Sequence, residues 1–99
     1  MATFNDIIKQ HPLVLVDFTA SWCGPCQVLA PILKDVKAHY EEALSIVKID
    51  VDKNNALAAN YKVQGVPTLI LFKDGVQVWR QSGVLQLAQL TAVIDSHRK

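Results

Sequence analysis

The 99-residue sequence lacks the features that mark several large classes of protein. It has no basic stripe or arginine cluster, and ten basic against nine acidic residues leave a formal net charge of +1, which argues against a nucleic-acid partner. No apolar run approaches the roughly 20 residues that span a bilayer. The first twenty residues lack the basic start and unbroken apolar core of a secretory signal. We therefore expect a soluble cytoplasmic protein with no membrane partner, on condition that Met1 is the natural start.

Low-complexity segments and internal repeats are also missing, and cysteine is scarce. The length fits one domain over residues 1–99, and a composition of 51% hydrophobic and 19% charged residues is globular. Such a chain buries roughly two-thirds of its unfolded surface and needs no disulfide staple or metal to fold. The only cysteines are Cys23 and Cys26. In a reducing compartment, a lone pair at this spacing is more often catalytic or metal-binding than structural.

The pattern of apolar residues predicts alternating helices and strands. We expect helices over residues 4–10, 23–40, 56–61 and from Leu85 onward, and strands over residues 13–18, 43–51, 68–72 and 76–81. Strand–helix–strand units imply parallel pairing, whereas the Asp74-Gly75 turn predicts an antiparallel hairpin. The fold class is therefore α/β, with a central mixed sheet of about four strands flanked by helices on both faces.

The two cysteines lie at the junction of the first strand and the second helix. Backbone N–H groups and the helix dipole at such a junction favour a thiolate. The alternatives are half of a zinc site or a static bridge. Zinc requires four ligands, and beyond the cysteines only the scattered His11, His39 and His97 remain. Redox chemistry is the favoured interpretation, and the sequence suggests no metal site.

The segment Val16-Asp17-Phe18-Thr19-Ala20-Ser21-Trp22-Cys23-Gly24-Pro25-Cys26 resembles the active-site segment of the thioredoxin family. The resemblance covers essentially the whole chain and continues through Ala30-Pro31, Lys48, Asp52, Gly65-Val66-Pro67-Thr68, Lys73-Asp74-Gly75 and Gly83. It implies the thioredoxin fold, here in a short form without the strand that precedes the first helix in many members. Thr19, Gln27 and Ser82 also depart from the common pattern, which leaves the choice of target proteins open.

The resemblance implies a protein-disulfide reductase that acts by dithiol–disulfide exchange and maintains cell redox homeostasis. Cys23 is expected to be reachable by solvent and to attack a target disulfide, and the more buried Cys26 to resolve the mixed disulfide. The Gly24-Pro25 spacer resembles that of reducing members. The family implies no bound cofactor, a monomer, disulfide-containing target proteins, and a thioredoxin reductase that is either an NADPH-linked flavoprotein or ferredoxin-linked.

Three residues outside the motif complete the expected site. Asp17 is a carboxylate in a buried strand, so desolvation should raise its pKa and suit it to take the proton of Cys26; a buried aspartate satisfied by hydrogen bonds is the alternative. By resemblance, Lys48 modulates the charge of Asp17, although a solvated surface lysine is nearly as well supported. The resemblance also implies that Pro67 is cis and that its geometry exposes the backbone of Val66 to an extended target.

An apolar docking rim for target proteins should surround the cysteines, because an exposed tryptophan beside a reactive thiol suits partner binding. Its expected members are Trp22, Gly24, Pro25, Val51, Val66, Pro67 and Gly83. Two other functions remain open: a disulfide oxidase or isomerase, which a more oxidising potential would reveal, and a binding module that does not need its cysteines.

Overall fold

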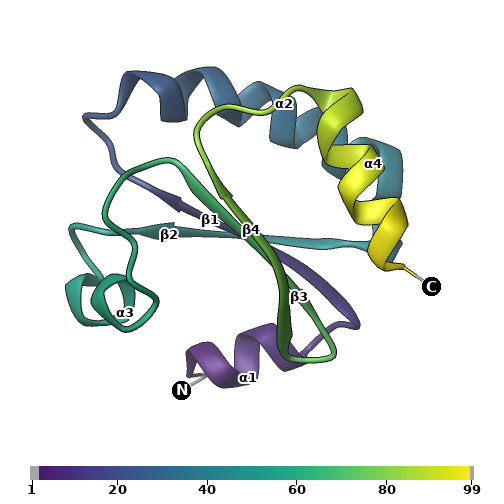
Figure 1. Ribbon diagram of the computed structural model, residues 1–99, viewed down its shortest axis with the longest axis horizontal. Helices are drawn as coiled ribbons and strands as arrows, with labels where there is room; N and C mark the ends of the chain where they lie inside the picture. The colour runs from purple at the N-terminus through teal and green to yellow at the C-terminus, as the bar shows by residue number, and fades with distance from the viewer. Residues whose placement is uncertain (1–2, 99) are drawn as a thin grey trace.

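The structure is a computed structural model that describes residues 3–98. Its elements, in chain order, are α1 (Phe4–Lys9), β1 (Leu13–Thr19), α2 (Gly24–Tyr40), the 3-10 helix η1 (Glu41–Ala43), β2 (Ser45–Asp50), α3 (Asn55–Asn60), β3 (Thr68–Lys73), β4 (Val76–Ser82) and α4 (Leu87–His97). Figure 1 shows their arrangement around one central sheet. None of the helices within residues 3–98 is long and apolar enough to cross a membrane.

The sheet is mixed, as predicted. Its strand order is β2-β1-β3-β4, with β1 parallel to β2 and antiparallel to β3, and with β3 antiparallel to β4. The β3–β4 hairpin turns at Asp74 and Gly75, whose φ angles of 51° and 81° are both positive. This is the turn geometry that Asp-Gly sequences favour, because its twist matches that of the strands. β2 and β4 form the two edges, and β1 is central.

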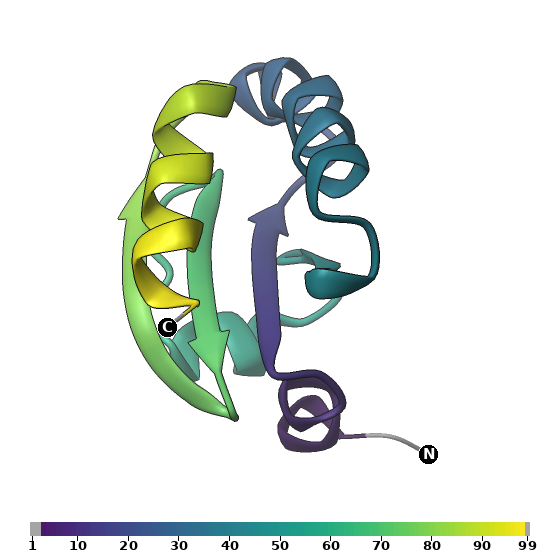
Figure 2. The ribbon, with the colours of Figure 1, turned by 90° about the vertical axis from the view of Figure 1, so that its right-hand side faces the viewer.

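Apolar cores lie on both faces of the sheet. On one face, α2 and α4 pack against Leu15, Leu69 and Leu71, and both views place these helices side by side (Figure 1 and Figure 2). On the other face, α1 and α3 cover Phe18 and Phe72. Strands buried on both sides explain the nearly unbroken apolar runs of β1 and β3. The core thus fixes the central strand, whose carboxyl end leads directly to the cysteines.

Several element boundaries differ from the predicted ones. Strand β2 begins at Ser45 rather than at residue 43, because the 3-10 helix η1 follows α2 directly. The Lys37 ammonium donates to the carbonyl oxygens of Glu41 and Leu44, both at 2.6 Å, and holds this turn. The last helix begins at Leu87, not Leu85, since a Gln86–Gln89 capping box starts it. Thr3 and Asp6 have the spacing of a helix capping box, and both hydrogen bonds of that box are present at the start of α1.

Candidate active site

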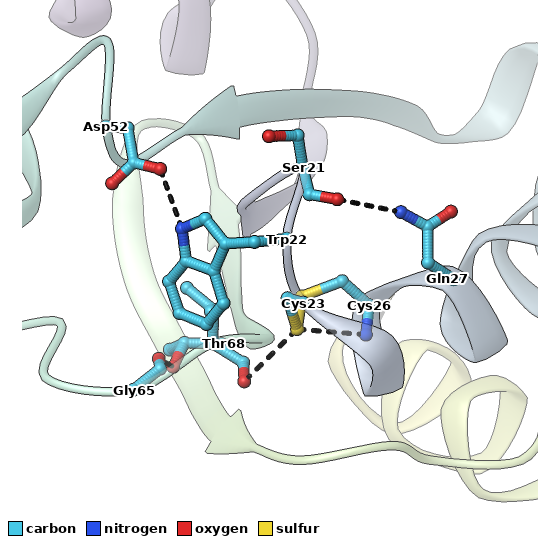
Figure 3. The surroundings of a disulfide bond; sticks show 9 residues. Ser21, Trp22, Cys23, Cys26, Gln27, Asp52, Gly65 and Thr68 are labelled. Carbon is cyan, nitrogen blue, oxygen red and sulfur yellow. Dashed lines mark hydrogen bonds between the residues drawn. A yellow bond between two sulfur atoms is a disulfide. The ribbon is translucent and has the colours of Figure 1, made fainter.

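Cys23 and Cys26 form a disulfide at the start of α2, where the chain leaves the central strand (Figure 3). Their Cα atoms are 5.3 Å apart. Cys23 is the N-cap residue, and the backbone N–H of Cys26 donates to its sulfur at 3.1 Å. An N-cap acceptor satisfies one of the unpaired N–H groups of the first turn. When the pair is reduced, the same N–H and the positive helix end would stabilise a thiolate on Cys23.

The expectation of a solvent-reachable Cys23 is wrong for this oxidised state. The exposed fractions are 3% for Cys23 and 5% for Cys26, so the first cysteine is no more open than the second. The physical reason is packing, since both sulfur-bearing side chains cluster with Ala20, Val51 and Val66. The sulfur of Cys23 lies 3.6 Å from the Val66 carbonyl oxygen. A disulfide sulfur carries no hydrogen to donate, so this approach is a packing contact.

The loop before β3 places Val66 beside the disulfide. The Val66–Pro67 peptide bond is cis, as the family resemblance implied. Two hydrogen bonds hold the loop: Thr68 Oγ1 donates to the Gly65 carbonyl at 2.6 Å, and the Gly83 N–H donates to the Pro67 carbonyl at 2.9 Å. Gly83, expected in the docking rim, therefore lies next to Pro67 although the two are far apart in the sequence.

Trp22 is the most exposed large hydrophobic residue near the disulfide, with an exposed fraction of 70%. Its indole Nε1 donates to Asp52 Oδ2 at 2.8 Å, which fixes the ring beside the cysteines (Figure 3). Gln27 Nε2 donates to the Ser21 carbonyl at 3.3 Å on the other side of the motif. Asp52 matches the family pattern, but the sequence predicted no role for it, because no local pattern predicts a contact across thirty residues.

The predicted docking rim is brought together only in part. Trp22, Gly24, Pro25 and Gly83 are exposed, and Val51 and Val66 are half-buried. Pro67 is buried, which corrects its placement on the rim; it lies beneath the surface as the first residue before β3. A cavity of about 90 Å³ lies beside Trp22, lined also by Val51, Val63, Gln64, Gly65 and Val66.

Asp17 has the environment that its position in β1 predicted. Its exposed fraction is 3%, and its Oδ1 has no hydrogen-bond partner within residues 3–98. Burial raises the pKa of Asp17 to about 6, and the positive charge of Lys48 opposes that rise. An aspartate fully satisfied by hydrogen bonds, the alternative interpretation, does not fit the unpartnered oxygen. Lys48 is itself exposed, so it is both a surface lysine and an electrostatic neighbour of Asp17.

A cavity of about 200 Å³ joins Asp17 to the second cysteine. Its lining residues are Asp17, Thr19, Ala20, Ser21, Cys26, Gln27, Ala30, Lys48 and Asp50. A water molecule occupies about 30 Å³ of liquid, so this space has room for several. The structure thus brings three of the predicted catalytic residues, Asp17, Cys26 and Lys48, to one cavity and places Cys23 at its margin through the disulfide. Elsewhere in residues 3–98, no three His, Cys, Asp or Glu side chains gather as metal ligands.

The cysteine pair lies at the amino end of a helix that follows the central strand of a mixed sheet, and a buried carboxyl group lies near it. This arrangement defines a thiol–disulfide oxidoreductase. The comparisons with known proteins give the family. The thioredoxin family model matches residues 1–96. The chain belongs to the thioredoxin family, and its Cys23–Cys26 pair is the redox-active centre of a dithiol–disulfide oxidoreductase.

Relatives and solved structures agree with this assignment. The chain is 51% identical over 90 residues to a thioredoxin-like protein of Synechocystis, covering 90% of this chain and 86% of the relative. It is 44% identical over 92 residues to thioredoxin of Acidithiobacillus ferridurans, covering 93% and 85%. A mutant thioredoxin of Halobacterium salinarum superposes with a TM-score of 0.86 at 42% identity, covering 96% of this chain and 82% of that one. The oxidized mitochondrial thioredoxin 3 of Saccharomyces cerevisiae gives 0.84 at 34% identity, covering 93% and 86%.

Proposed function

We propose that the protein reduces disulfides of target proteins, with Cys23 as the nucleophile and Cys26 as the resolving thiol. The observation that carries these roles is the hydrogen bond from the Cys26 N–H to the Cys23 sulfur at the start of α2. This donor and the helix end favour negative charge on Cys23, whereas Cys26 lies one turn inside the helix. A stabilised thiolate on the first cysteine is what nucleophilic attack on a disulfide requires.

The exchange proceeds in two steps that together move two electrons to the target. The Cys23 thiolate attacks one sulfur of the target disulfide, that S–S bond breaks, and the other target sulfur leaves and takes up a proton. Cys26 then loses its proton and attacks the Cys23 sulfur. The mixed disulfide breaks, the second target sulfur leaves as a thiolate and takes up a proton, and the Cys23–Cys26 disulfide remains.

Asp17 is the proposed acceptor for the proton of Cys26. The two side chains line the same cavity, which has room for a bridging water, and a carboxyl group with a pKa of about 6 is able to take and release a proton near neutral pH. Lys48 is proposed to keep this carboxyl group from becoming too basic, because its charge lowers the pKa that burial raises.

Target proteins are proposed to dock on the exposed surface around Trp22, Gly24, Pro25 and Gly83, with Val51 and Val66 in its half-buried floor. Exposed tryptophan and an accessible backbone near the reactive sulfur support this role. Pro67 contributes from below, since its carbonyl holds the Gly83 N–H.

The proposed partners are disulfide-containing proteins and a thioredoxin reductase, either an NADPH-linked flavoprotein or a ferredoxin-linked enzyme, that returns electrons to the pair. We propose that residues 1–99 act as one thioredoxin domain, as a monomer without a bound cofactor. A reducing role suits the cytoplasm, where thiols are kept reduced.

Reduction of insulin disulfides tests the proposal, with dithiothreitol as the electron source so that no reductase is needed. Wild type should turn over, whereas Cys23→Ser and Cys26→Ser should both lose turnover. In a separate reaction without dithiothreitol, Cys26→Ser should accumulate a mixed disulfide with insulin through Cys23, visible as a mass increase that later addition of dithiothreitol reverses. Asp17→Asn should turn over more slowly than wild type, with the larger difference above pH 6.

Two outcomes would contradict the assigned roles. Turnover by Cys23→Ser would mean that Cys23 is not the nucleophile. An unchanged rate for Asp17→Asn across pH 5 to 8 would leave Asp17 with a structural role only. A reduction potential near the oxidising end of the family would favour a disulfide oxidase instead.

A further inference from the structure

A second cavity lies further along α2, between this helix and the edge strand β2. Its volume is about 240 Å³, and it is lined by Ala30, Leu33, Lys34, Lys37, Ile46 and Lys48. Three of these residues are apolar, and the other three are lysines. An apolar floor surrounded by positive charge suits a ligand that combines an apolar group with carboxylates.

The three lysines do not serve the same purpose. Lys37 is committed to the fold, since its ammonium group donates to the carbonyl oxygens of Glu41 and Leu44 at the end of α2. Lys34 and Lys48 are exposed, and their ammonium groups make no hydrogen bond or ion pair with any residue of the described chain, 3–98. Lys48 acts on Asp17 only through its field, across the β1–β2 pair. Two positive charges are therefore available to a ligand.

This cavity adjoins the active-site cavity. Ala30 and Lys48 line both this cavity and the one that contains Cys26 and Asp17. Lys34 follows Cys26 by eight residues of α2, which is about 12 Å along the helix axis. An extended peptide covers that distance with about four residues.

We propose that this cavity binds an acidic segment of the target protein whose disulfide is reduced. An apolar side chain of that segment fills the space over Leu33 and Ile46, and neighbouring carboxylates lie beside Lys34 and Lys48. The proposal rests on the proposed function, and it adds a substrate class: targets with an apolar residue and acidic residues about four positions from the reactive cysteine.

Charge and shape favour a protein segment over other anionic partners. Anionic membranes are bound by clusters of about four to eight lysines or arginines, whereas two charges are available here. Nucleic acid requires a longer row of phosphate contacts. The site instead offers one apolar space with charges at its margin, at a fixed separation from the redox centre.

Two peptides that differ only in charge test the inference. Each contains one intramolecular disulfide, a spacer of four residues, and then either Leu-Glu-Glu or Leu-Gln-Gln. At 20 mM salt, wild type should reduce the glutamate peptide with a kcat/KM about five-fold higher, and 0.5 M NaCl should abolish most of the difference because exposed charges are then screened. Lys34→Gln should lower this preference two- to five-fold and leave the rate on the glutamine peptide unchanged. Lys53→Gln removes another exposed lysine and should change neither rate.

Binding is measured separately with a cysteine-free form of the glutamate peptide, by ¹H–¹⁵N NMR of the oxidised protein. Backbone shifts should concentrate in residues 30–37 and 46–48 and weaken in Lys34→Gln. Equal rates for the two peptides together with normal insulin reduction would overturn the acidic docking site and leave the proposed function standing. Loss of all disulfide reduction would overturn the proposed function, while the NMR titration would still decide whether the site binds the acidic peptide. Shifts confined to other residues, or equal shifts with phosphatidylglycerol vesicles or free glutamate, would overturn the site.

Discussion

Asp17 lies directly opposite Lys48 in the parallel pairing of β1 with β2. Two effects act on the Asp17 carboxyl group in opposite directions. Burial raises its pKa to about 6, and the positive charge of Lys48 opposes that rise. Asp17 Oδ1 has no hydrogen-bond partner within residues 3–98, and loss of solvation is the largest contribution to the pKa of this carboxyl group. Lys48, the strand neighbour of Asp17, therefore keeps the pKa of this buried carboxyl group close to neutral pH.

Replacing Asp17 with asparagine should stabilise the oxidised protein at pH 7.5. Between pH 4 and pH 6, the folded state keeps a proton on Asp17 that the unfolded chain, with a pKa near its ordinary value of 3.8, has released. Stability is therefore lost as the pH rises through this window, and the full cost of about 3 kcal/mol applies above pH 6. Urea unfolding of wild type and Asp17→Asn should differ by about 2 to 3 kcal/mol at pH 7.5 and converge by pH 4.

Asp35→Asn provides the matched control, because Asp35 is an exposed carboxylate of α2. Its unfolding free energy should stay within about 0.5 kcal/mol of wild type at both pH values. A difference between wild type and Asp17→Asn that persists unchanged at pH 4 would contradict the electrostatic explanation and indicate a change in packing.

Neutralising Lys48 should raise the pKa of Asp17 further. Lys48→Gln removes the positive charge that opposes the effect of burial, so the carboxyl group should hold its proton to higher pH. ¹³C NMR of the Asp17 carboxyl carbon measures this directly in the oxidised protein. Lys53→Gln is the control and should leave the titration unchanged. An unshifted Asp17 titration in Lys48→Gln would show that solvent screens the pair.

The sequence was informative wherever the signal is local. The capping pair of Thr3 and Asp6, the Asp74-Gly75 hairpin and the cysteines at a strand–helix junction were all predictable because each depends on neighbouring residues. The raised pKa of Asp17 was also predictable, since a charged residue within an apolar strand has few routes to water. Its unpartnered Oδ1 was not, because hydrogen bonds to this carboxyl group were an open alternative. These features carry the fold class and the chemistry.

Contacts between distant segments were not predictable in the same way. Val66 packs over Cys23 and helps to close the disulfide off from solvent, and this contact depends on where the loop before β3 lies. The bond between Trp22 and Asp52 likewise joins residues of separate elements. A pattern of single residues along the chain does not encode such distances, which is why Cys23 was expected to be open and Asp52 was given no role.

Removing the Tyr40 hydroxyl should loosen the packing of α2 against α4. Tyr40 is buried at the end of α2. Its hydroxyl has two hydrogen-bond acceptors on α4, the Thr91 carbonyl oxygen at 3.0 Å and Asp95 Oδ1 at 2.7 Å. Tyr40→Phe should lower the free energy of unfolding by about 1 to 2 kcal/mol, measured in urea at pH 7. The Tyr61 hydroxyl makes no hydrogen bond within residues 3–98, so Tyr61→Phe is the control and should cost less than about 0.5 kcal/mol. Equal losses in the two variants would mean that the Tyr40 hydroxyl contributes nothing specific.

The hydrogen bond between Trp22 and Asp52 should act on target binding and not on the exchange chemistry. Trp22 is exposed beside the disulfide, and the 2.8 Å bond from its indole N–H to Asp52 fixes the ring that a target would contact. Asp52→Ala leaves the ring free to rotate, so each docking event must order it again. The KM for insulin should therefore rise about three-fold, within the usual net value of one hydrogen bond, with kcat unchanged.

The same bond is removed from its other end by Trp22→Phe, which also takes away part of the contact surface. If loss of this hydrogen bond causes the rise in KM, Asp52→Ala should not raise KM further in the Trp22→Phe background. The double-mutant cycle should then show coupling between the two residues. Asp35→Ala, which removes an exposed carboxylate from α2, should leave KM and kcat at wild-type values. Additive effects of the two substitutions, or a fall in kcat at constant KM in Asp52→Ala, would contradict a role in ordering the ring and would place Asp52 in the chemistry of the cysteines instead.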